Sequence, residues 1–202
     1  MDAIVLATNN QGKVKELSVM LEPFGVEVKP LSDFPEIGDI PETGDTFVEN
    51  AFIKARTAAE ITGLVAVADD SGIEIDALGG RPGVHSARYA GPQRDDADNN
   101  EKMLEELKGV PDEKRTGRYR CVMAVSAPNG TEIAADGAYD IVVAHEYKGD
   151  GGFGYDVIVK DPELGCHVAE LDPEVKNGRS HRGKAMRRLL ELWPDFWAKA
   201  QA

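Results

Sequence analysis

The sequence contains little cysteine and no long apolar run. Its two cysteines, Cys121 and Cys166, belong to no C-x-x-C or C-x-x-H pattern, which argues against a zinc site and a disulfide framework. No stretch approaches the roughly 18 apolar residues of a membrane span. The apolar residues 3–7 are too few, and lack the basic flank, for a secretory signal. We therefore expect a cytoplasmic protein with two buried, reduced thiols.

Positive charge is also scarce. The chain has 23 Lys and Arg residues against 36 Asp and Glu residues, which gives a net charge of -13 and a pI near 4.7. Such a chain repels polyanions at long range, so nucleic acids and anionic membranes are poor partners. A small anion such as a nucleotide can still bind where backbone N–H groups, basic side chains and a metal ion reverse the potential locally.

The spacing of apolar residues predicts alternating strands and helices. We expect strands at residues 3–7, 24–28, 64–68, 119–125, 131–147 and 157–159, an extended segment at 73–78, and helices at 13–21, 46–62, 96–108 and 180–193, with one more turn after Pro194. Thr46 and Glu49 form a capping box, and Pro128-Asn129-Gly130 joins two strands as a hairpin. Because repeats and linkers are lacking, we expect residues 1–202 to form a single α/β domain with one long, twisted, mixed β-sheet flanked by helices.

A polar turn follows the first predicted strand. It consists of Thr8, Asn9, Asn10, Gln11, Gly12 and Lys13. A turn before a helix directs backbone N–H groups and the positive end of the helix dipole to one point, which suits a phosphate. An ordinary strand-to-helix connection explains the same residues, and the spacing is not that of a Walker loop.

Two adjacent carboxylates, Asp69 and Asp70, follow the apolar strand 64–68. Mg²⁺ in a polyphosphate complex prefers such oxygen ligands. The alternative is a turn in which the aspartates cap backbone N–H groups.

Two further segments are unusual. In residues 151–156, three glycines flank Phe153 and Tyr155, so that a base could stack on a ring and donate to Asp156; a tight turn with core-facing rings explains the segment equally well. Lys176, His181 and Arg182 bring positive charge to the start of the last helix, where it is unfavourable unless an anion binds there. Lys184, Arg187 and Arg188 fit a solvated helix face. Together the four segments indicate a magnesium-dependent enzyme that acts on a nucleotide.

The motifs also resemble those of a known family, the inosine/xanthosine triphosphate pyrophosphatases of the Ham1 or RdgB type. The resemblance runs from residue 4 to about residue 190. In chain order the matching motifs are Thr8-x-Asn10-x-x-Lys13-x-x-Glu16-Leu17, Glu42-Thr43-Gly44-x-Thr46-Phe47-x-Glu49-Asn50-Ala51-x-x-Lys54-Ala55, Ala68-Asp69-Asp70-Ser71-Gly72, Leu78-Gly79-Gly80-x-Pro82-Gly83, Ser86-Ala87-Arg88-Tyr89, Gly151-Gly152-Phe153-Gly154-Tyr155-Asp156 and Ser180-His181-Arg182-Gly183-Lys184-Ala185.

The resemblance implies a homodimer that uses Mg²⁺ to hydrolyse ITP, dITP and XTP to the monophosphate and pyrophosphate, in a cleft between two lobes. Residues 8–13 and Lys54 would hold the triphosphate. Glu42 and Asp69 would organise the metal, Asp69 would also act as general base, and Asp70 would lie near the substrate. The base pocket would consist of Phe153, Gly154, Tyr155, Asp156, Lys176, His181 and Arg182.

Three positions depart from the family pattern around the expected base pocket. Val157 replaces a proline, Val175 replaces a glutamate, and Arg179 replaces an apolar residue. Because all three flank the pocket, they bear on substrate preference more than on reaction type. Two alternatives remain: a nucleotide-binding regulatory protein without turnover, and a nucleotide phosphatase that releases orthophosphate.

Overall fold

The computed structural model of the chain describes residues 2–8 and 11–202. The chain divides into two compact units. Unit 1 comprises Met1–Asp70, Val122–Asp136 and Ala185–Ala202, and unit 2 comprises Ser71–Cys121 and Gly137–Lys184.

The strands form one seven-stranded sheet in the order β2-β1-β3-β5-β6-β7, with β4 paired to β3. Their bounds are β1 Asp2–Leu6, β2 Val26–Pro30, β3 Val65–Ile75, β4 Pro82–Gly83, β5 Thr116–Ser126, β6 Glu132–Val143 and β7 Val159–Lys160. β1 is parallel to β2 and β3, whereas β4 is antiparallel to β3 and β7 is antiparallel to β6. The predicted mixed sheet is confirmed.

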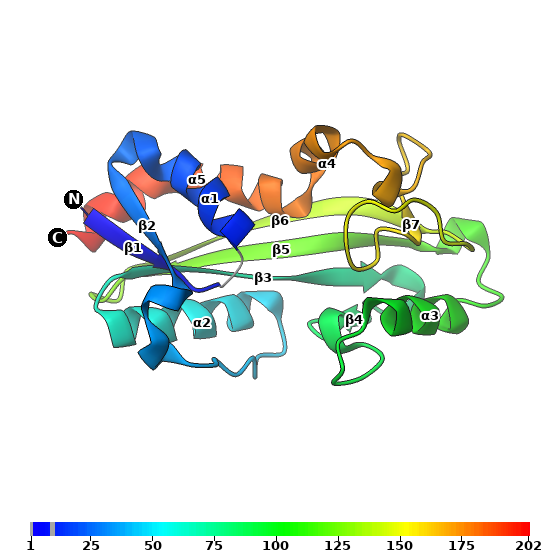
Figure 1. Cartoon of the computed structure of the whole chain (residues 1–202), viewed down its shortest axis with the longest axis horizontal. Helices are drawn as coiled ribbons and strands as arrows, with labels where there is room; N and C mark the ends of the chain where they lie inside the picture. The colour runs from blue at the N-terminus through cyan, green and yellow to red at the C-terminus, as the bar shows by residue number, and fades with distance from the viewer. Residues whose placement is uncertain (1, 9–10) are drawn as a thin grey trace. The chain divides into compact units, whose positions relative to one another are not determined.

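In unit 1, α2 (Phe47–Thr62) covers one face of the sheet, and α1 (Gln11–Leu21) and α5 (His181–Ala200) cover the other (Figure 1). Ala58 and Ala59 of α2 pack on Val5 and Ala66 of the sheet. The predicted capping box is confirmed, because the Thr46 hydroxyl accepts from Glu49 N at 3.2 Å and the Glu49 carboxylate accepts from Thr46 N at 3.0 Å.

Strand β3 is longer than the sequence predicts. The charged and glycine-containing residues 69–72 indicated its end, but it continues to Ile75. β1 pairs with β3 only as far as Leu6 opposite Val67, so Asp69 and Asp70 lie in extended backbone just beyond the end of β1. Further along, Ile73 and Glu74 pair with β4, and these bonds keep the backbone extended past the glycine.

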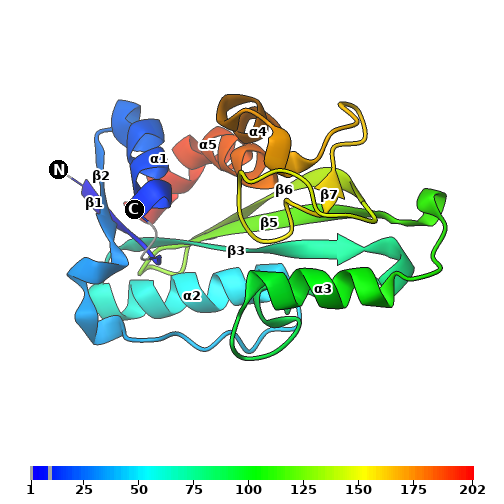
Figure 2. The same ribbon diagram turned by 45° about the vertical axis from the view of Figure 1, so that its right-hand side comes forward.

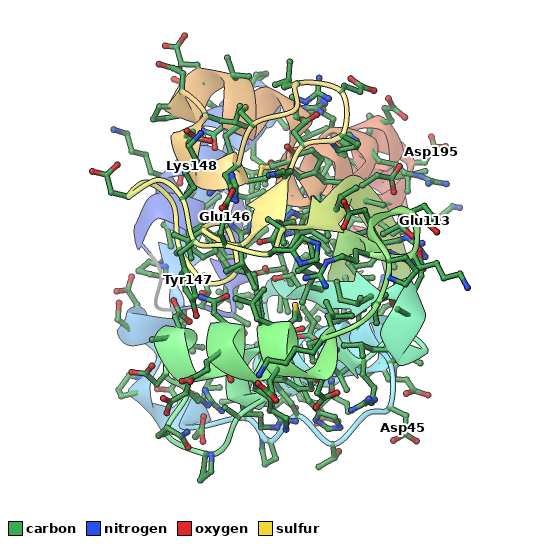
Figure 3. The ribbon with its side chains drawn as sticks, turned by 90° about the vertical axis from the view of Figure 1, so that its right-hand side faces the viewer. Asp45, Glu113, Glu146, Tyr147, Lys148 and Asp195 are labelled. Atoms are coloured by element: carbon green, nitrogen blue, oxygen red, sulfur yellow. The ribbon has the colours of Figure 1, made fainter. Side chains whose placement is uncertain are left out.

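The predicted hairpin is present. β5 and β6 are neighbours in the sheet, and between them Gly130 N donates to Ala127 O at 2.9 Å. β6 ends at Val143 rather than at residue 147. The labelled residues Glu146, Tyr147 and Lys148 lie on the exposed loop that follows (Figure 3).

In unit 2, α3 (Asp96–Glu106) and α4 (Pro173–Arg179) lie on opposite faces of the sheet (Figure 2). The core contains apolar residues from several elements, among them Ile73, Met103, Tyr119, Ile141 and Tyr155. α4 was not predicted, and the short strand predicted at 157–159 begins two residues later, at β7. Single-turn 3-10 helices occur at Glu22–Phe24, Leu31–Asp33, Pro35–Ile37, Asp76–Leu78, Ser86–Arg88, Asp112–Lys114 and Val168–Glu170.

The last helix also differs from expectation. α5 runs without a break through Pro194 to Ala200. Trp193 and Phe196, on either side of the proline, are buried at 0% and 1% exposure, and their packing holds the helix together where proline cannot donate a hydrogen bond. Cys121 is buried as expected, whereas Cys166 is half-buried. Within residues 2–8 and 11–202, no helix has the length and apolar character needed to cross a bilayer.

Candidate active site

The first cluster of site residues lies in unit 1, where Lys13 binds Asp69. Lys13 Nζ donates to both carboxylate oxygens, at 2.8 and 2.7 Å. Lys13 stands in the first turn of α1, where the helix dipole disfavours a positive charge, and the buried Asp69 carboxylate compensates for it. The pair places an ammonium and a carboxylate next to a helix N-terminus.

A second lysine of unit 1 bridges two carboxylates. Lys54 Nζ, from α2, donates to Glu42 Oε1 at 2.8 Å and to Asp70 Oδ1 at 3.2 Å. Glu42 reaches this point because the loop that carries it is fixed to the first turns of α2, where Gly44 N donates to Asn50 Oδ1 at 2.8 Å. The structure therefore groups Glu42 with Asp70, whereas the family resemblance groups it with Asp69.

The loop containing Glu42 needs a glycine at position 44. A Cβ on Gly44 would lie 2.6 Å from Glu49 Cβ, which is closer than packed carbon atoms allow. This close approach explains the glycine of the Glu42-Thr43-Gly44 motif.

Burial and charge shift the pKa values of this cluster. Burial, with the negative charge of Glu42, raises the pKa of Asp70 above its ordinary value, although Lys54 lowers it. Burial opposes the charge of Lys54, but the attraction of Asp70 and the hydrogen bond and charge of Glu42 outweigh it and raise the pKa of Lys54. Two carboxylates that repel each other around one cation form a site with excess negative charge.

The carboxylates of this cluster fit a magnesium ion. No group of three or more His, Cys, Asp or Glu residues in the described part of the chain is arranged to hold a metal by itself. Mg²⁺ does not require one, because it commonly binds through one or two carboxylates and takes its other ligands from water and phosphate. Glu42 and Asp70 already converge on one cationic group, the Lys54 ammonium, and Asp69 is the residue before Asp70 in β3.

The predicted phosphate turn is only partly described. Asn9 and Asn10 lie outside the described residues. Thr8 N donates to Leu6 O at 2.7 Å at the end of β1, and Gln11 and Gly12 are the first two residues of α1. The helix therefore begins two residues earlier than predicted.

The second cluster lies in unit 2, around a cavity of about 180 Å³. Seven residues predicted for the base pocket line it: Phe153, Gly154, Tyr155, Asp156, Lys176, His181 and Arg182. The two aromatic residues differ in role. Phe153 is 65% exposed, whereas Tyr155 is buried and its hydroxyl donates to Ser86 O at 2.8 Å. Phe153 is thus the ring available for stacking.

Asp156 organises this pocket. Its buried carboxylate accepts from the Tyr119 hydroxyl at 3.0 Å, from Phe153 N at 2.9 Å and from Lys176 Nζ at 2.5 Å. The Lys176 ammonium also lies 4.7 Å from the centre of the Phe153 ring. Gly152 allows this arrangement, because its φ is +77° and a Cβ there would lie 2.3 Å from an Asp156 oxygen.

Sequence reasoning missed several residues that shape the pocket. On α3, Asp96 accepts from Gly154 N at 2.9 Å and Asn100 donates to Gly154 O at 3.0 Å, so both backbone polar groups of Gly154 are held. The available signal was a polar pair at i and i+4, with Asn100 only 2% exposed.

Sequence reasoning also missed two tyrosines of the hairpin, Tyr119 and Tyr139, which it placed in strands without a role at the site. Tyr119 stacks on His181 with ring centres 5.1 Å apart and an interplanar angle of 17°. Burial and the charge of Asp156 raise the pKa of Tyr119 well above its ordinary value, so it remains a hydrogen-bond donor. Tyr139 lines the same cavity.

Comparisons with known proteins agree with this architecture. A family model described as the Ham1 family matches residues 4–192. A protein of Nitratidesulfovibrio vulgaris named dITP/XTP pyrophosphatase is 56% identical over 200 residues, which cover 96% of this chain and 97% of that protein. The solved structure of a HAM1 protein from Coxiella burnetii superposes with a TM-score of 0.91 at 43% identity and covers 96% of this chain and 100% of that chain. The Staphylococcus aureus Ham1 protein gives the same TM-score at 36% identity, with coverages of 96% and 99%. The chain belongs to the Ham1 family.

Proposed function

We propose that this chain is a nucleoside-triphosphate pyrophosphatase that hydrolyses ITP, dITP and XTP to the monophosphate and pyrophosphate with Mg²⁺. The observation that carries the proposal is the mutual pairing of lysines and carboxylates in unit 1. Lys13 and Lys54, which suit phosphate, are neutralised by Asp69, Glu42 and Asp70, which suit a cation. A magnesium–triphosphate complex carries both complementary charges. Its phosphates can therefore replace the carboxylates as partners of the lysines, and its magnesium ion can replace the lysines as partner of the carboxylates.

In this proposal, the lysines turn to the triphosphate together with the residues of the turn at 8–13. Glu42 and Asp69 would hold Mg²⁺, with Asp70 beside Asp69 in β3. When bound, Mg²⁺ neutralises negative charge on the phosphates. Asp69, released from Lys13, accepts a proton from the attacking water as general base.

The pocket of unit 2 suits a purine base with an oxygen at C6. Hypoxanthine and xanthine present an acceptor at C6 and a donor at N1, whereas adenine presents the reverse at both positions. Lys176, His181 and Arg182 line the cavity and supply donors for the oxygen, while Phe153 supplies a stacking surface. Adenine would leave buried donors unpaired, at a cost of about 1 to 3 kcal/mol each.

Three broader features belong to the same proposal. The 202 residues act as one enzyme domain, the protein assembles as a homodimer, and it works in the cytoplasm, where nucleotide pools are found. The Nitratidesulfovibrio vulgaris protein named dITP/XTP pyrophosphatase is matched over 97% of its length, which supports an activity carried by the whole chain.

The decisive experiment incubates the purified protein with ITP and Mg²⁺ and measures pyrophosphate and orthophosphate separately. We expect pyrophosphate in a one-to-one ratio with IMP, and hydrolysis of ATP that is at least about 100-fold less efficient. Release of orthophosphate would indicate a nucleotide phosphatase. Tight binding of ITP with no turnover would indicate a regulatory protein.

A further inference from the structure

Helix α4 lacks the usual means of attachment to a protein core. The structure describes all seven of its residues, Pro173–Arg179, and none of them is buried. A helix of this length is unstable by itself in water. Its position on unit 2, on the face of the sheet opposite α3 (Figure 2), must therefore depend on polar contacts of its side chains.

Two basic residues one turn apart on α4 each bind a buried aspartate. Lys176 Nζ donates to Asp156 Oδ2 at 2.5 Å, and Arg179 Nε donates to Asp161 Oδ2 at 2.6 Å. The aspartates are 3% and 0% exposed. Arg179 Nη2 also donates to Asp161 Oδ1 at 3.3 Å, which makes the contact bidentate, and to Glu163 at 2.6 Å.

Each aspartate also accepts from a tyrosine of the hairpin. The Tyr119 hydroxyl donates to Asp156 at 3.0 Å, and the Tyr139 hydroxyl donates to Asp161 at 2.8 Å. The two rings stack with centres 6.4 Å apart, and both line the cavity. The two contacts of α4 are thus built on the same plan from neighbouring strands.

The two contacts differ in their surroundings. Lys176 lines the cavity, whereas Arg179 contacts Asp161, whose carboxylate also binds backbone N–H groups of the turn that follows it. Asp161 Oδ1 accepts from Glu163 N at 2.8 Å and from Leu164 N at 3.0 Å. Burial alone would raise the pKa of Asp161, but these bonds, with those from Tyr139 and Arg179, lower it. Asp161 therefore stays charged and fixed.

We propose that Arg179 and Asp161 form a positioning pair that keeps α4 on unit 2 while Lys176 exchanges Asp156 for the base of a bound nucleotide. The identity of that ligand rests on the proposed function, but the attachment of α4 does not. Because Ser180, His181 and Arg182 follow Arg179 directly, the same pair also sets the start of α5. Arg179, one of the departures from the family pattern, thereby contributes to base recognition without contacting the base.

Hydrogen exchange measured by mass spectrometry tests the attachment without any ligand. Lys176→Met imitates the departure of Lys176 from Asp156, and we expect the amides of α4 to exchange less than about twofold faster. In Arg179→Met the same amides should exchange about 10-fold faster or more, because a charge-assisted bidentate contact is lost. Arg179→Lys, which keeps the charge but not the fork, should restore part of the protection. Arg188→Met removes an arginine whose ion pair with Asp136 is exposed and should leave α4 unchanged.

Steady-state kinetics with ITP tests the effect on the pocket. In Arg179→Met and in Asp161→Asn we expect KM to rise about 10-fold with kcat within about twofold of the unmodified protein. The double variant should be no worse than either single variant, because both changes break one interaction.

The proposal is overturned if Lys176→Met releases α4 as much as Arg179→Met does, or if α4 is released while KM for ITP stays the same. Failure of the unmodified protein to release pyrophosphate from ITP would instead refute the proposed function. The exchange of α4 in the two variants would still decide whether Arg179 is its attachment.

Discussion

The chemistry proposed for unit 1 depends on single side chains that already pair with groups of opposite charge. Asp69 is held by Lys13 at both oxygens and stands in extended backbone beyond the end of β1. Asp69→Asn keeps the size of the side chain but removes its charge and its capacity to accept a proton. We expect turnover of ITP to fall about 100-fold or more, measured as pyrophosphate release at saturating Mg²⁺.

The matched control for this change is Asp140→Asn, at a carboxylate that is 83% exposed and belongs to neither cluster. It should leave turnover near normal. If Asp69→Asn also retained near-normal turnover with an unchanged melting temperature, Asp70 would become the leading candidate for the general base.

The charge of Asp70 should lower the stability of the folded protein at neutral pH. Its pKa is raised in the folded protein, so the folded state binds this proton more readily than the unfolded state does. The contribution of the group to stability is therefore fully present below its ordinary pKa of about 3.9 and is lost as the pH rises through the folded value. At pH 7 the charge of the Asp70 carboxylate therefore costs stability.

Asp70→Asn should therefore raise the urea midpoint of unfolding at pH 7 while it lowers turnover. The difference from the unmodified protein should shrink as the pH falls through the raised pKa toward the ordinary value. Equilibrium unfolding at a series of pH values measures this difference. A lower urea midpoint for Asp70→Asn at pH 7 would instead show that the Lys54 contact, not burial, dominates the energetics of Asp70.

At the scale of elements, the sequence predicted the helix caps and turns that local patterns encode. It missed features of strands and helices that depend on contacts with distant parts of the chain. The capping box at Thr46 and the turn at residues 128–130 are local signals, and both are present. β3 extends past its glycine because β4 supplies hydrogen bonds from elsewhere in the chain. α4 has no apolar face, so periodicity could not reveal it.

The residues of the candidate site also fall into two groups: those that a local sequence pattern revealed and those whose role depends on distant partners. Lys13, Asp69 and Lys176 were visible because charged residues stood out in turns and at a helix start. Tyr119 and Asp96 were not, because an aromatic residue in a strand and an acid in a helical first turn are ordinary there. Their roles arise from contacts with residues 37 and 58 positions away.

The loop at residues 151–156 gives a prediction of its own. Gly152→Ala combines a positive φ of +77° with a Cβ 2.3 Å from Asp156 Oδ2 and 2.8 Å from Lys176 Nζ. We expect KM for ITP to rise about 10-fold or more, because Lys176 must move. Gly130→Ala is the control, since its φ is +85° but nothing lies within 4 Å of the added Cβ.

Both alanine variants should lose about 1 kcal/mol or more of stability from backbone strain. Only Gly152→Ala should change KM. Equal kinetics in the two variants would mean that the Asp156–Lys176 contact does not shape the binding site.

At the scale of the whole molecule, we expect the protein to assemble as a symmetric homodimer. The resemblance to the family implies a homodimer, with residues 86–89 near the twofold contact, and a closed symmetric pair is the commonest arrangement of soluble oligomers. Sedimentation should give a mass about twice the chain mass of 21.9 kDa. A mass equal to one chain at all concentrations would contradict this prediction.

The net charge of the molecule makes metal dependence the most informative property of the whole enzyme. A chain of charge -13 repels a triphosphate, and Glu42, Asp69 and Asp70 concentrate that repulsion next to the lysines that should bind it. Removing divalent cations with EDTA should therefore reduce turnover of ITP to background, and raised ionic strength alone should not restore it, because screening is weak for partly buried charges. Added Mg²⁺ should restore turnover, and Asp69→Asn should require a higher Mg²⁺ concentration for its residual activity. Full activity in EDTA would show that Lys13 and Lys54 suffice to hold the triphosphate, and that the carboxylates serve only to position them.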